Sequence, residues 1–588
     1  MATLLERLDS TPPHAIEESH NFMSNPNAAV NELADRFWEG ALERDPVYAT
    51  ILGDDRWDDR LPDLGEAGRA ADAAAYRETL AEAETIDPTG LDTEQVITRD
   101  MLLLVAETHI EALEQKQYQL TINHIFGVQT MPVRVAQYQI ADTREGLERL
   151  LTRLAAYPTA IEQEIETLRE GLGDGRTGAA VPVRKEIEQI ERMLALPVED
   201  FPAVTMAHVA DDAARARVQA AVEAHIYPAL HGLAAFLADE YEARARSEPG
   251  ISATPGGDEA YRLAIRMHTT VDTTPDEVHR FGLEDLSHIE AEKDEIARRA
   301  GHRDRSAYAK ALAEDPSNRP TSKEQIVELA VEQTQRAFAT APRYFGRLPT
   351  ADCEVKAVEE YREREVPPAF YMPPSVDGSR AGQYYINTYQ PEERQLHGLA
   401  SITFHEATPG HHFQLAIEME LTGLPAFRTL GSRMAGAAYS EGWGLYCERL
   451  ADEMGLYLSD AERLGMLNAQ SFRAARLVVD SGLHAFGWSR ARAIEFMHER
   501  GSLPLVDAEI EVDRYTIWPG QALAYKIGQR EIERARREVS ELMGDRFDLR
   551  TFHDEVLGHG SVPLATLRRE ILGWVEAAVA AREGAPAG

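Results

Sequence analysis

Apolar residues recur at helical spacing over most of the first two thirds of the chain, and this periodicity is the feature that most restricts the fold. The stretches Asn31 to Leu52 and Thr98 to Leu113 show it clearly. Thr274, Pro275 and Glu277 have the pattern of a capped helix start. Leucine-rich stripes of this kind are the core faces of packed helices. The sequence therefore predicts a mainly α fold in which helix packs on helix.

The length of 588 residues exceeds what one compact core usually supports. A Pro- and Gly-rich break from Ser247 to Gly257 marks a boundary near residue 250. We therefore expect a large two-lobed helical body, with a helical N-terminal lobe over residues 1–250 and a second helical lobe over residues 251–588. The alternative is one continuous domain made of both lobes.

The pattern changes between Phe370 and Tyr389. Phe370 to Met372 and Gln383 to Asn387 are aromatic and β-branched runs, and Asp377-Gly378-Ser379 between them favours a turn. A small β-hairpin or sheet is expected here. Pro391, followed by two glutamates, predicts a helix that begins there and runs into the histidine cluster.

Charge and cysteine content exclude several classes of protein. With 61 Lys and Arg against 99 Asp and Glu, the net charge of −38 repels nucleic acids and anionic lipid surfaces. The two cysteines, Cys353 and Cys447, exclude a disulfide framework and an all-cysteine metal site. Met1 to Phe22 lacks the apolar core of a signal peptide, and no later run reaches membrane-spanning length. We expect a cytoplasmic protein without nucleic-acid or membrane partners.

The segment His405-Glu406-Ala407-Thr408-Pro409-Gly410-His411-His412 has the composition of a hydrolytic zinc site. Such a site needs three nitrogen or oxygen ligands, an open position for water and a carboxylate that takes the proton from that water. In the usual motif the second histidine lies four residues after the first, and here that position is Pro409. At a rise of about 1.5 Å per residue, His411 and His412 lie too far along an unbroken helix to share an ion with His405. The helix is therefore expected to bulge at Pro409-Gly410 and bring His411 or His412 to the second ligand place.

The third ligand is expected from a nearby helix. Glu441 is followed by Gly442 and Gly444, which let helices approach closely, and Glu448 is a second candidate two turns along the same face. The competing interpretation makes the histidines surface or capping residues and Glu441 an ion-pair partner. Three histidines and a glutamate within eight residues favour the metal site. We expect one Zn²⁺ per chain with Glu406 as general base, although the same ligands accept manganese or cobalt.

These motifs carry a resemblance to a known family. The segments 405–414, 440–448, 476–484 and 518–528 resemble a bacterial family known as domain of unknown function 885, over most of the chain. More distantly, the pattern is similar to helical gluzincin peptidases of the thimet-oligopeptidase, angiotensin-converting-enzyme and thermostable-carboxypeptidase kinds. That similarity implies His411, preceded by Gly410, as the second ligand and Glu441 as the third. The inserted residues leave the choice between His411 and His412 open.

The resemblance implies further site residues. In such peptidases a strand ahead of the metal helix binds the substrate backbone, and the matching segment contains Gln383 and Tyr385; the alternative is a covering hairpin. A late tyrosine stabilises the oxyanion, and Tyr525 is the best match, with a buried aromatic as the alternative. Asp480 and His484, four residues apart, can meet on one helix face, either to orient a ligand or contact substrate or as a structural ion pair.

The sequence therefore predicts a zinc-dependent metallopeptidase that hydrolyses small peptides. By analogy, a two-lobed body implies a deep channel that excludes folded proteins. Carboxypeptidase action would need a carboxylate anchor, for which Arg476, Arg514 and Lys526 are the candidates. The alternatives are a zinc amidase or other hydrolase of non-peptide amides, and a catalytically silent helical binding protein, against which the presence of Glu406 argues. The oligomeric state is open, with a homodimer as one candidate.

Overall fold

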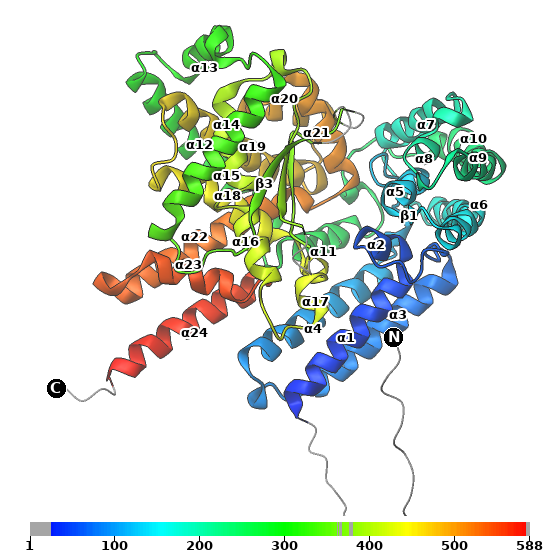
Figure 1. Cartoon of the computed structure of the whole chain (residues 1–588), viewed down its shortest axis with the longest axis horizontal. Coiled ribbons are helices and arrows are strands. Elements are labelled where there is room, and N and C mark those ends of the chain that lie inside the picture. Colours follow the sequence, from blue (N-terminus) through cyan, green and yellow to red (C-terminus); the bar gives the residue numbers. More distant parts are fainter. Residues whose placement is uncertain (1–24, 361–362, 364–366, 376–379, 584–588) are drawn as a thin grey trace, which may run out of the picture.

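A computed structural model of the chain describes residues 25–583 except 361–362, 364–366 and 376–379. Helices make up most of it, and the strands of this part are confined to a three-stranded sheet and one pair of very short strands (Figure 1). The predicted mainly α fold is therefore confirmed. The predictions on Met1 to Phe22 and on the turn Asp377-Gly378-Ser379 fall outside the described residues. No described helix combines the length and apolar character that crossing a bilayer requires.

Up to residue 250 the helices are α1 (Pro26–Arg44), α2 (Pro46–Ile51), α3 (Glu66–Thr85), α4 (Thr93–Glu114), α5 (Met131–Tyr138), α6 (Arg144–Asp174), α7 (Ala180–Leu194), α8 (Pro202–Thr205), α9 (Asp212–Ala221) and α10 (Tyr227–Phe236). The later helices are α11 (Gly257–Thr269), α12 (Pro275–Arg299), α13 (Arg305–Glu314), α14 (Lys323–Thr340), α15 (Leu399–Glu406), α16 (His411–Met419), α17 (Ala426–Thr429), α18 (Ala438–Glu453), α19 (Asp460–His484), α20 (Arg490–Arg500), α21 (Leu505–Ile517), α22 (Ala524–Met543), α23 (Leu549–Gly558) and α24 (Leu564–Glu583).

Local sequence signals explain several helix boundaries. The predicted helical stretch from Asn31 to Leu52 is two helices, because Pro46 lacks the N–H needed to continue α1 and opens α2 instead. The capped start at Thr274 is confirmed: the Thr274 hydroxyl accepts from the Glu277 N–H at 3.3 Å, and the Glu277 carboxylate accepts from the Thr274 N–H at 2.9 Å.

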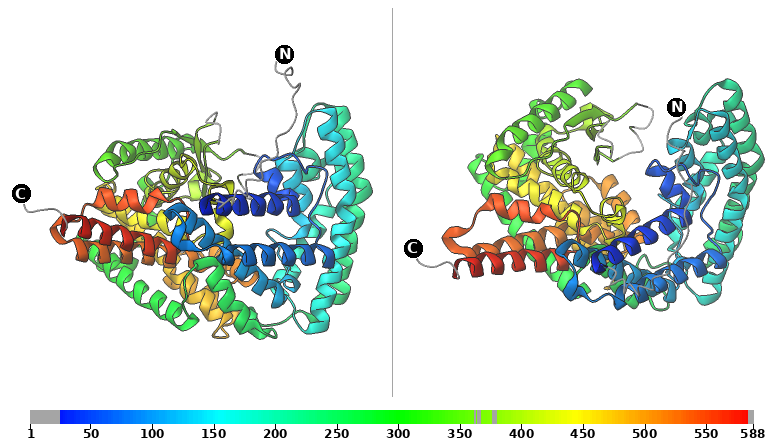
Figure 2. Two further views of the ribbon diagram at one scale, coloured as in Figure 1. Left: turned by 90° about the horizontal axis from the view of Figure 1, so that it is seen from below. Right: turned by 60° about the horizontal axis from the view of Figure 1, so that its bottom comes forward.

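Helices α5 to α10 share a hydrophobic core of their own. Leu150 and Leu154 on α6 pack in it with Ile190 on α7 and with Leu230 and Leu233 on α10, all of them fully or almost fully buried. Figures 1 and 2 show these helices, in cyan and teal, stacked at one end of the molecule.

A second, larger core draws on both ends of the chain. Phe37 on α1 meets Phe427 on α17 edge to face with ring centroids 5.3 Å apart, and Ile97 and Met101 on α4 are fully buried in the same core. The first and fourth helices therefore pack against the half of the molecule that follows residue 250.

The three-stranded sheet has the order β3 (Cys353–Ala357), β5 (Gly382–Ile386), β4 (Ala369–Met372). Strands β4 and β5 are antiparallel, so the predicted pairing of these two runs is confirmed, and β3 adds to β5 in parallel. Strand β5 is thus central, and all five of its residues are buried. The remaining pair, β1 (Ile140–Ala141) and β2 (His208–Val209), lies in the N-terminal half.

The prediction that a helix begins at Pro391 is wrong, because α15 begins at Leu399. Residues Pro391–Glu393 form a single 3₁₀ turn, after which Arg394 is extended, with its Nε–H donating to the Tyr389 carbonyl at 2.9 Å. A second turn, Leu396–Gly398, leads into α15. The backbone of Arg394, with φ −86° and ψ 160°, is extended and therefore interrupts the helix between the two turns.

Two carboxyl groups are buried inside the first core. Glu164 on α6 accepts from the Thr121 hydroxyl, and Glu186 on α7 accepts from the Asn123 N–H at 2.9 Å. Burial, reinforced by the charge of Glu164, raises the pKa of Glu186 to about 8. In the unfolded chain the pKa of this carboxyl is about 4.3. Between these pH values the folded protein holds more protons than the unfolded chain, so Glu186 makes the free energy of unfolding fall as the pH rises.

We predict that Glu186→Gln, which keeps the accepting oxygen and cannot ionise, reduces this pH dependence. Wild type should lose thermal stability between about pH 5 and about pH 8 more steeply than the variant. Glu188→Gln, on the exposed face of the same helix, is the control and should follow wild type. Thermal unfolding at both pH values measures the difference, and parallel curves for wild type and Glu186→Gln would contradict the prediction.

Candidate metal centre

The histidine cluster lies at a break between two helices. Helix α15 ends at Glu406, and α16 begins at His411, as the predicted interruption at Pro409-Gly410 requires. The carbonyl of Pro409 accepts from the Trp443 indole N–H at 3.0 Å and from the Cys447 thiol at 3.2 Å. Helix α18 thus holds the connecting segment in place, and the two helices set their histidines at an angle to each other.

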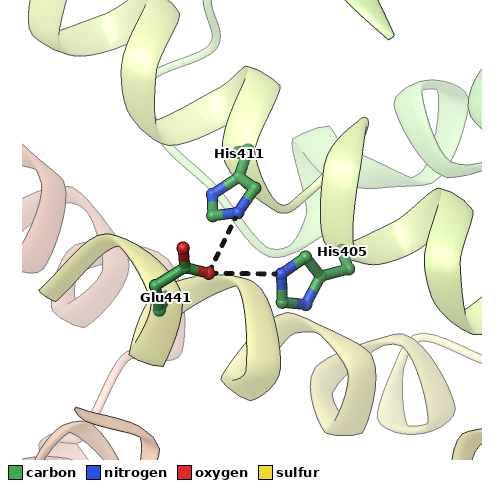
Figure 3. Close-up of side chains that lie close together, drawn as sticks. All are labelled: His405, His411 and Glu441. Atoms are coloured by element: carbon green, nitrogen blue, oxygen red, sulfur yellow. Dashed lines mark ion pairs between the residues drawn. The ribbon is translucent and has the colours of Figure 1, made fainter. Parts of the chain in front are cut away.

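His405, His411 and Glu441 converge on one point (Figure 3). The Glu441 Oε2 atom lies 3.7 Å from His405 Nε2 and 3.6 Å from His411 Nε2. The two imidazoles are nearly perpendicular, with ring centroids 4.7 Å apart. Each residue comes from a different helix, α15, α16 or α18, and both histidines are almost fully buried.

The spacing of these atoms fits a shared metal ion. Distances of 3.6 and 3.7 Å are too long for good hydrogen bonds. Two ligands of a tetrahedral zinc ion, each about 2.0–2.2 Å from the metal, lie about 3.4 Å apart. Two imidazole nitrogens and one carboxylate oxygen are also a donor set that zinc accepts. The residues present therefore fit the metal that the sequence predicts.

The electrostatics of the site favour a cation. Burial opposes protonation of His405, but the Glu441 and Glu448 carboxylates outweigh it and raise its pKa to about 9. Burial also opposes ionisation of Glu441, yet the two histidines hold its pKa well below the usual range. The carboxylates thus create a negative potential at the histidines, which attracts protons and divalent cations alike.

Glu448 is placed behind His405 and not at the point of convergence. Its Oε1 atom lies 2.9 Å from His405 Nδ1, the nitrogen that faces away from Glu441, and the carboxylate is almost fully buried. The alternative that makes Glu448 the third ligand is therefore wrong, because its oxygen is engaged by the other side of the ring. Burial raises the pKa of Glu448, but the hydrogen bond to His405 outweighs it and leaves the pKa below its ordinary value. A carboxylate in this place fixes the orientation of the imidazole.

A chain of buried polar groups continues from Glu448. Its Oε2 atom accepts from the Ser401 hydroxyl at 3.0 Å and from the Gln470 amide at 3.3 Å. Gln470 in turn accepts from Lys526 Nζ at 2.8 Å, and Lys526 forms an ion pair with Asp285 at 2.8 Å. Lys526, one of the three candidate carboxylate anchors, is therefore already paired with Asp285.

His411 and His412 have different surroundings. Ser440 Oγ lies 3.4 Å from His411 Nδ1 and donates to Gln414 at 2.9 Å, so its oxygen can accept the Nδ1 proton. His412 is turned toward the sheet, where its Nδ1 lies 2.9 Å from the Tyr371 hydroxyl. Burial lowers the pKa of His412 to about 4. Consecutive residues of a helix point about 100° apart, so only His411 reaches Glu441.

The two glycines after Glu441 allow the close approach predicted from the sequence. A Cβ atom on Gly444 would lie 2.8–3.1 Å from ring atoms of His405. A Cβ atom on Gly442 would lie 2.4 Å from the backbone of Gly528 on α22. Glycine is needed at both positions because the neighbouring atoms are in the way of any side chain.

Tyr525 lies at the start of α22, beside the three convergent residues. Its ring stacks on that of His405 with centroids 6.5 Å apart. Burial, together with the charge of Glu441, raises the pKa of its phenol. No hydrogen bond of its hydroxyl is found among the described residues. The phenol is therefore a proton donor at the edge of the site.

Gln383 and Tyr385 are not on an open strand edge. Strand β5 is paired with β3 on one side and β4 on the other, so its backbone groups are already engaged. The Tyr385 hydroxyl donates to the Gln383 side chain at 3.0 Å. The expectation that this strand binds a substrate backbone is wrong, because β3, which the sequence analysis did not identify, occupies the second edge.

Asp480 and His484 are buried and bonded to other groups. Asp480 accepts from the Tyr261 hydroxyl at 2.6 Å and from the Gly520 N–H at 3.2 Å. His484 Nδ1 accepts from the Ile251 N–H at 3.1 Å. The predicted roles in substrate contact or in a mutual ion pair are therefore not realised, and both side chains hold loops of the fold in place.

The chain matches the model of a family described as "Bacterial protein of unknown function (DUF885)" over residues 46–571. It belongs to this family. Several solved structures resemble this DUF885 protein. A "putative lipoprotein" from Colwellia psychrerythraea is 26% identical with a TM-score of 0.84, and the match covers 94% of this chain and 100% of that one. A "putative lipoprotein of unknown function" from Shewanella oneidensis is 18% identical with a TM-score of 0.75 and covers 92% and 99%. No curated protein matches the chain.

Neither the family description nor the two related structures state an activity. The similarity to the Shewanella oneidensis protein shows a common fold only. The description as a lipoprotein applies to those two proteins. The cytoplasmic location expected from the sequence stays a prediction. Residues 46–571 include all three helices that carry His405, His411 and Glu441.

We predict that Glu448→Gln weakens zinc binding while the fold is kept. The amide preserves the shape of the side chain but removes the charge that orients His405, so the Kd for zinc should rise about 10- to 100-fold. Competition with a chromogenic chelator measures it. Glu453→Gln, at the exposed end of the same helix, is the control. An unchanged Kd in Glu448→Gln would show that His405 needs no such support.

Proposed function

We propose that this DUF885 protein is a zinc-dependent hydrolase that cleaves peptide bonds of small peptides. The observation that carries the proposal is the convergence of two imidazole nitrogens and one carboxylate oxygen at the spacing of ligands on one ion. His405, His411 and Glu441 would hold a zinc ion, which would supply a Lewis acid that polarises a carbonyl group and makes water more acidic. Three protein ligands are the number found in catalytic zinc sites, whereas structural sites have four.

Glu406 is suited to act as the general base. It directly follows His405 at the end of α15, is partly exposed, and makes no hydrogen bond or ion pair within the described residues. In the proposed reaction its carboxylate takes a proton from the attacking water as the water oxygen bonds to the carbonyl carbon. The carbon–nitrogen bond then breaks, and Glu406 returns the proton to the departing amine.

Tyr525 is suited to stabilise the oxyanion. Its phenol lies beside His405 and forms no hydrogen bond in the described part of the chain, so it can donate one to a substrate. A hydrogen bond that strengthens as the carbonyl oxygen gains charge lowers the barrier.

The distant similarity to helical gluzincin peptidases belongs to this proposal. His411 preceded by Gly410, and Glu441 in its Glu-Gly context, take the places of the second and third ligands in that comparison. The substrate strand is the point of difference, since β5 is closed on both edges.

We predict that Glu406→Gln retains zinc and loses hydrolysis. Purified wild type should contain about one zinc per chain and cleave short peptides, whereas the variant should keep the metal and lose about a hundredfold or more in rate. Glu332→Gln, at an exposed position of α14, is the control.

Metal analysis by mass spectrometry and chromatography of peptide digests give the two measurements. No metal in either protein would refute the zinc site, and equal hydrolysis would displace Glu406 as the base. Cleavage of non-peptide amides with peptides left intact would make the protein an amidase. Bound zinc without any hydrolysis would identify a silent binding protein.

We also predict that Tyr525→Phe lowers kcat by about a hundredfold or more and changes KM little, because the lost hydrogen bond acts in the transition state. Zinc content should stay at the wild-type value. Steady-state kinetics on one peptide measure kcat and KM for both proteins. An unchanged kcat would show that Tyr525 serves only as a packed aromatic side chain.

A further inference from the structure

Three arginine side chains gather around Tyr525. The guanidinium carbon of Arg476 lies 4.2 Å from the centroid of the Tyr525 ring, and that of Arg473 lies 5.7 Å from it. Arg476 Nη2 and Arg514 Nη1 both donate to the amide oxygen of Gln521, at 3.1 and 3.4 Å. Arg473 and Arg476 are three residues apart on α19 and share one face of it, and Arg514 comes from α21. We call Arg473, Arg476 and Arg514 the basic cluster.

The basic cluster has few ion-pair partners among the described residues. Arg514 pairs with Glu511 at 2.6 Å, and this is the one carboxylate that forms an ion pair with the cluster among the described residues. Asp480 is close enough to interact with Arg476 and Arg514, but it accepts from Tyr261 and Gly520, and burial raises its pKa to about 7. Three guanidinium groups therefore share one ion-pair partner, Glu511, among the described residues, in a chain whose net charge is −38.

The cluster also has hydrogen-bond donors to spare. The Nε atoms of Arg473, Arg476 and Arg514 are all buried without a hydrogen-bond partner. Arg476 is only 2% exposed, although a guanidinium presents five N–H donors and a buried charge is normally paired. An anionic ligand would satisfy positively charged donors that lack partners at one place in a protein interior.

The basic cluster borders the candidate metal centre. Tyr525 connects the two, since its ring lies beside Arg476 at 4.2 Å and stacks on His405 at 6.5 Å. The charge of Arg473 also acts on Glu448, the carboxylate behind His405. A peptide bound at the cluster therefore needs only a few residues to reach the point where His405, His411 and Glu441 converge.

We propose that the basic cluster binds the C-terminal carboxylate of the peptide substrate, so that the protein acts as a carboxypeptidase. This inference rests on the proposed hydrolase function and names its substrate class. A planar guanidinium pairs with a carboxylate through two parallel hydrogen bonds. Because each residue of a peptide spans at most about 3.3–3.6 Å, an anchored C-terminus places one of the last few peptide bonds at the metal centre.

The reaction is the hydrolysis already described, applied to the end of a chain. The water oxygen bonds to the carbonyl carbon, the carbon–nitrogen bond breaks, and the departing amine takes the proton from Glu406. The products are a shortened peptide with a new carboxylate and a short C-terminal fragment that keeps the original one. No other reactant is needed.

A different role for the cluster would be to act on Tyr525 alone. Guanidinium groups beside a phenol favour its ionised form and so strengthen it as a hydrogen-bond donor. That role predicts equal losses for every substrate when an arginine is removed. The carboxylate anchor predicts losses confined to substrates with a free C-terminus, and this difference is the basis of the test.

The experiment compares one peptide as its free acid and as its C-terminal amide. Zinc-loaded wild type should prefer the free acid in kcat/KM by about 10- to 100-fold, the worth of a hydrogen bond to a charged group. Arg476→Gln should lose about that factor on the acid and little on the amide. Arg476→Lys should recover part of it, because the charge remains and the planar fork is lost. Tyr525→Phe should lower both substrates alike.

Controls guard against misfolding. Arg463→Gln, on the same helix but paired with Asp452 away from the cluster, should match wild type. If Arg476→Gln fails to fold by circular dichroism or loses zinc, Arg473→Gln, at a partly exposed position, takes its place with the same expected loss of preference.

Calorimetric binding of the two peptides to zinc-loaded Glu406→Gln separates this inference from the proposed function. Tighter binding of the free acid, lost on adding Arg476→Gln, supports the anchor even if turnover is absent. Equal cleavage of acid and amide by wild type overturns the anchor and leaves the hydrolase intact. If zinc-loaded wild type cleaves neither peptide, the hydrolase proposal fails, and equal binding of both peptides would then overturn the anchor as well.

Discussion

The hydrogen bond between His405 and Glu448 is the interaction on which the arrangement of the site depends. Both groups are buried, and a buried carboxylate without a partner would cost several kcal/mol. Glu448 also accepts hydrogen bonds from Ser401 and Gln470, and Gln470 accepts one from Lys526. Because these residues come from α15, α18, α19 and α22, satisfying one carboxylate fixes four helices relative to one another.

Local pattern predicted the parts of the site that are local in sequence. The helix break follows from Pro409-Gly410, and the candidate ligands His405, His411 and Glu441 were all named from composition, spacing and resemblance. The choice between His411 and His412 could not be made in advance, because it depends on the residue at which α16 begins. One residue of register turns a side chain by about 100°.

Features that depend on long-range packing were missed. The two strands at Phe370 and Gln383 were predicted. The third strand, β3, lies outside that stretch and pairs with the other edge of β5, and the residues of the hairpin do not indicate this pairing. Asp480 has the spacing of a functional pair with His484, yet its partner is Tyr261, more than two hundred residues earlier. Arg473 carries no local signal at all, since a single arginine on a helix is most often solvated.

The residues that converge at the metal centre are also far apart in the order of synthesis. His405 and His411 leave the ribosome before Glu441 and Glu448, and Arg476 and Tyr525 follow later still. A growing chain thus releases its two histidines from the ribosome before the carboxylates that orient and complete the set, and folding from the N-terminus cannot complete the centre before α18 has emerged. A chain truncated before α18 would therefore carry the two histidines but not the carboxylates. Only a chain synthesised at least to the end of that helix can form the complete centre.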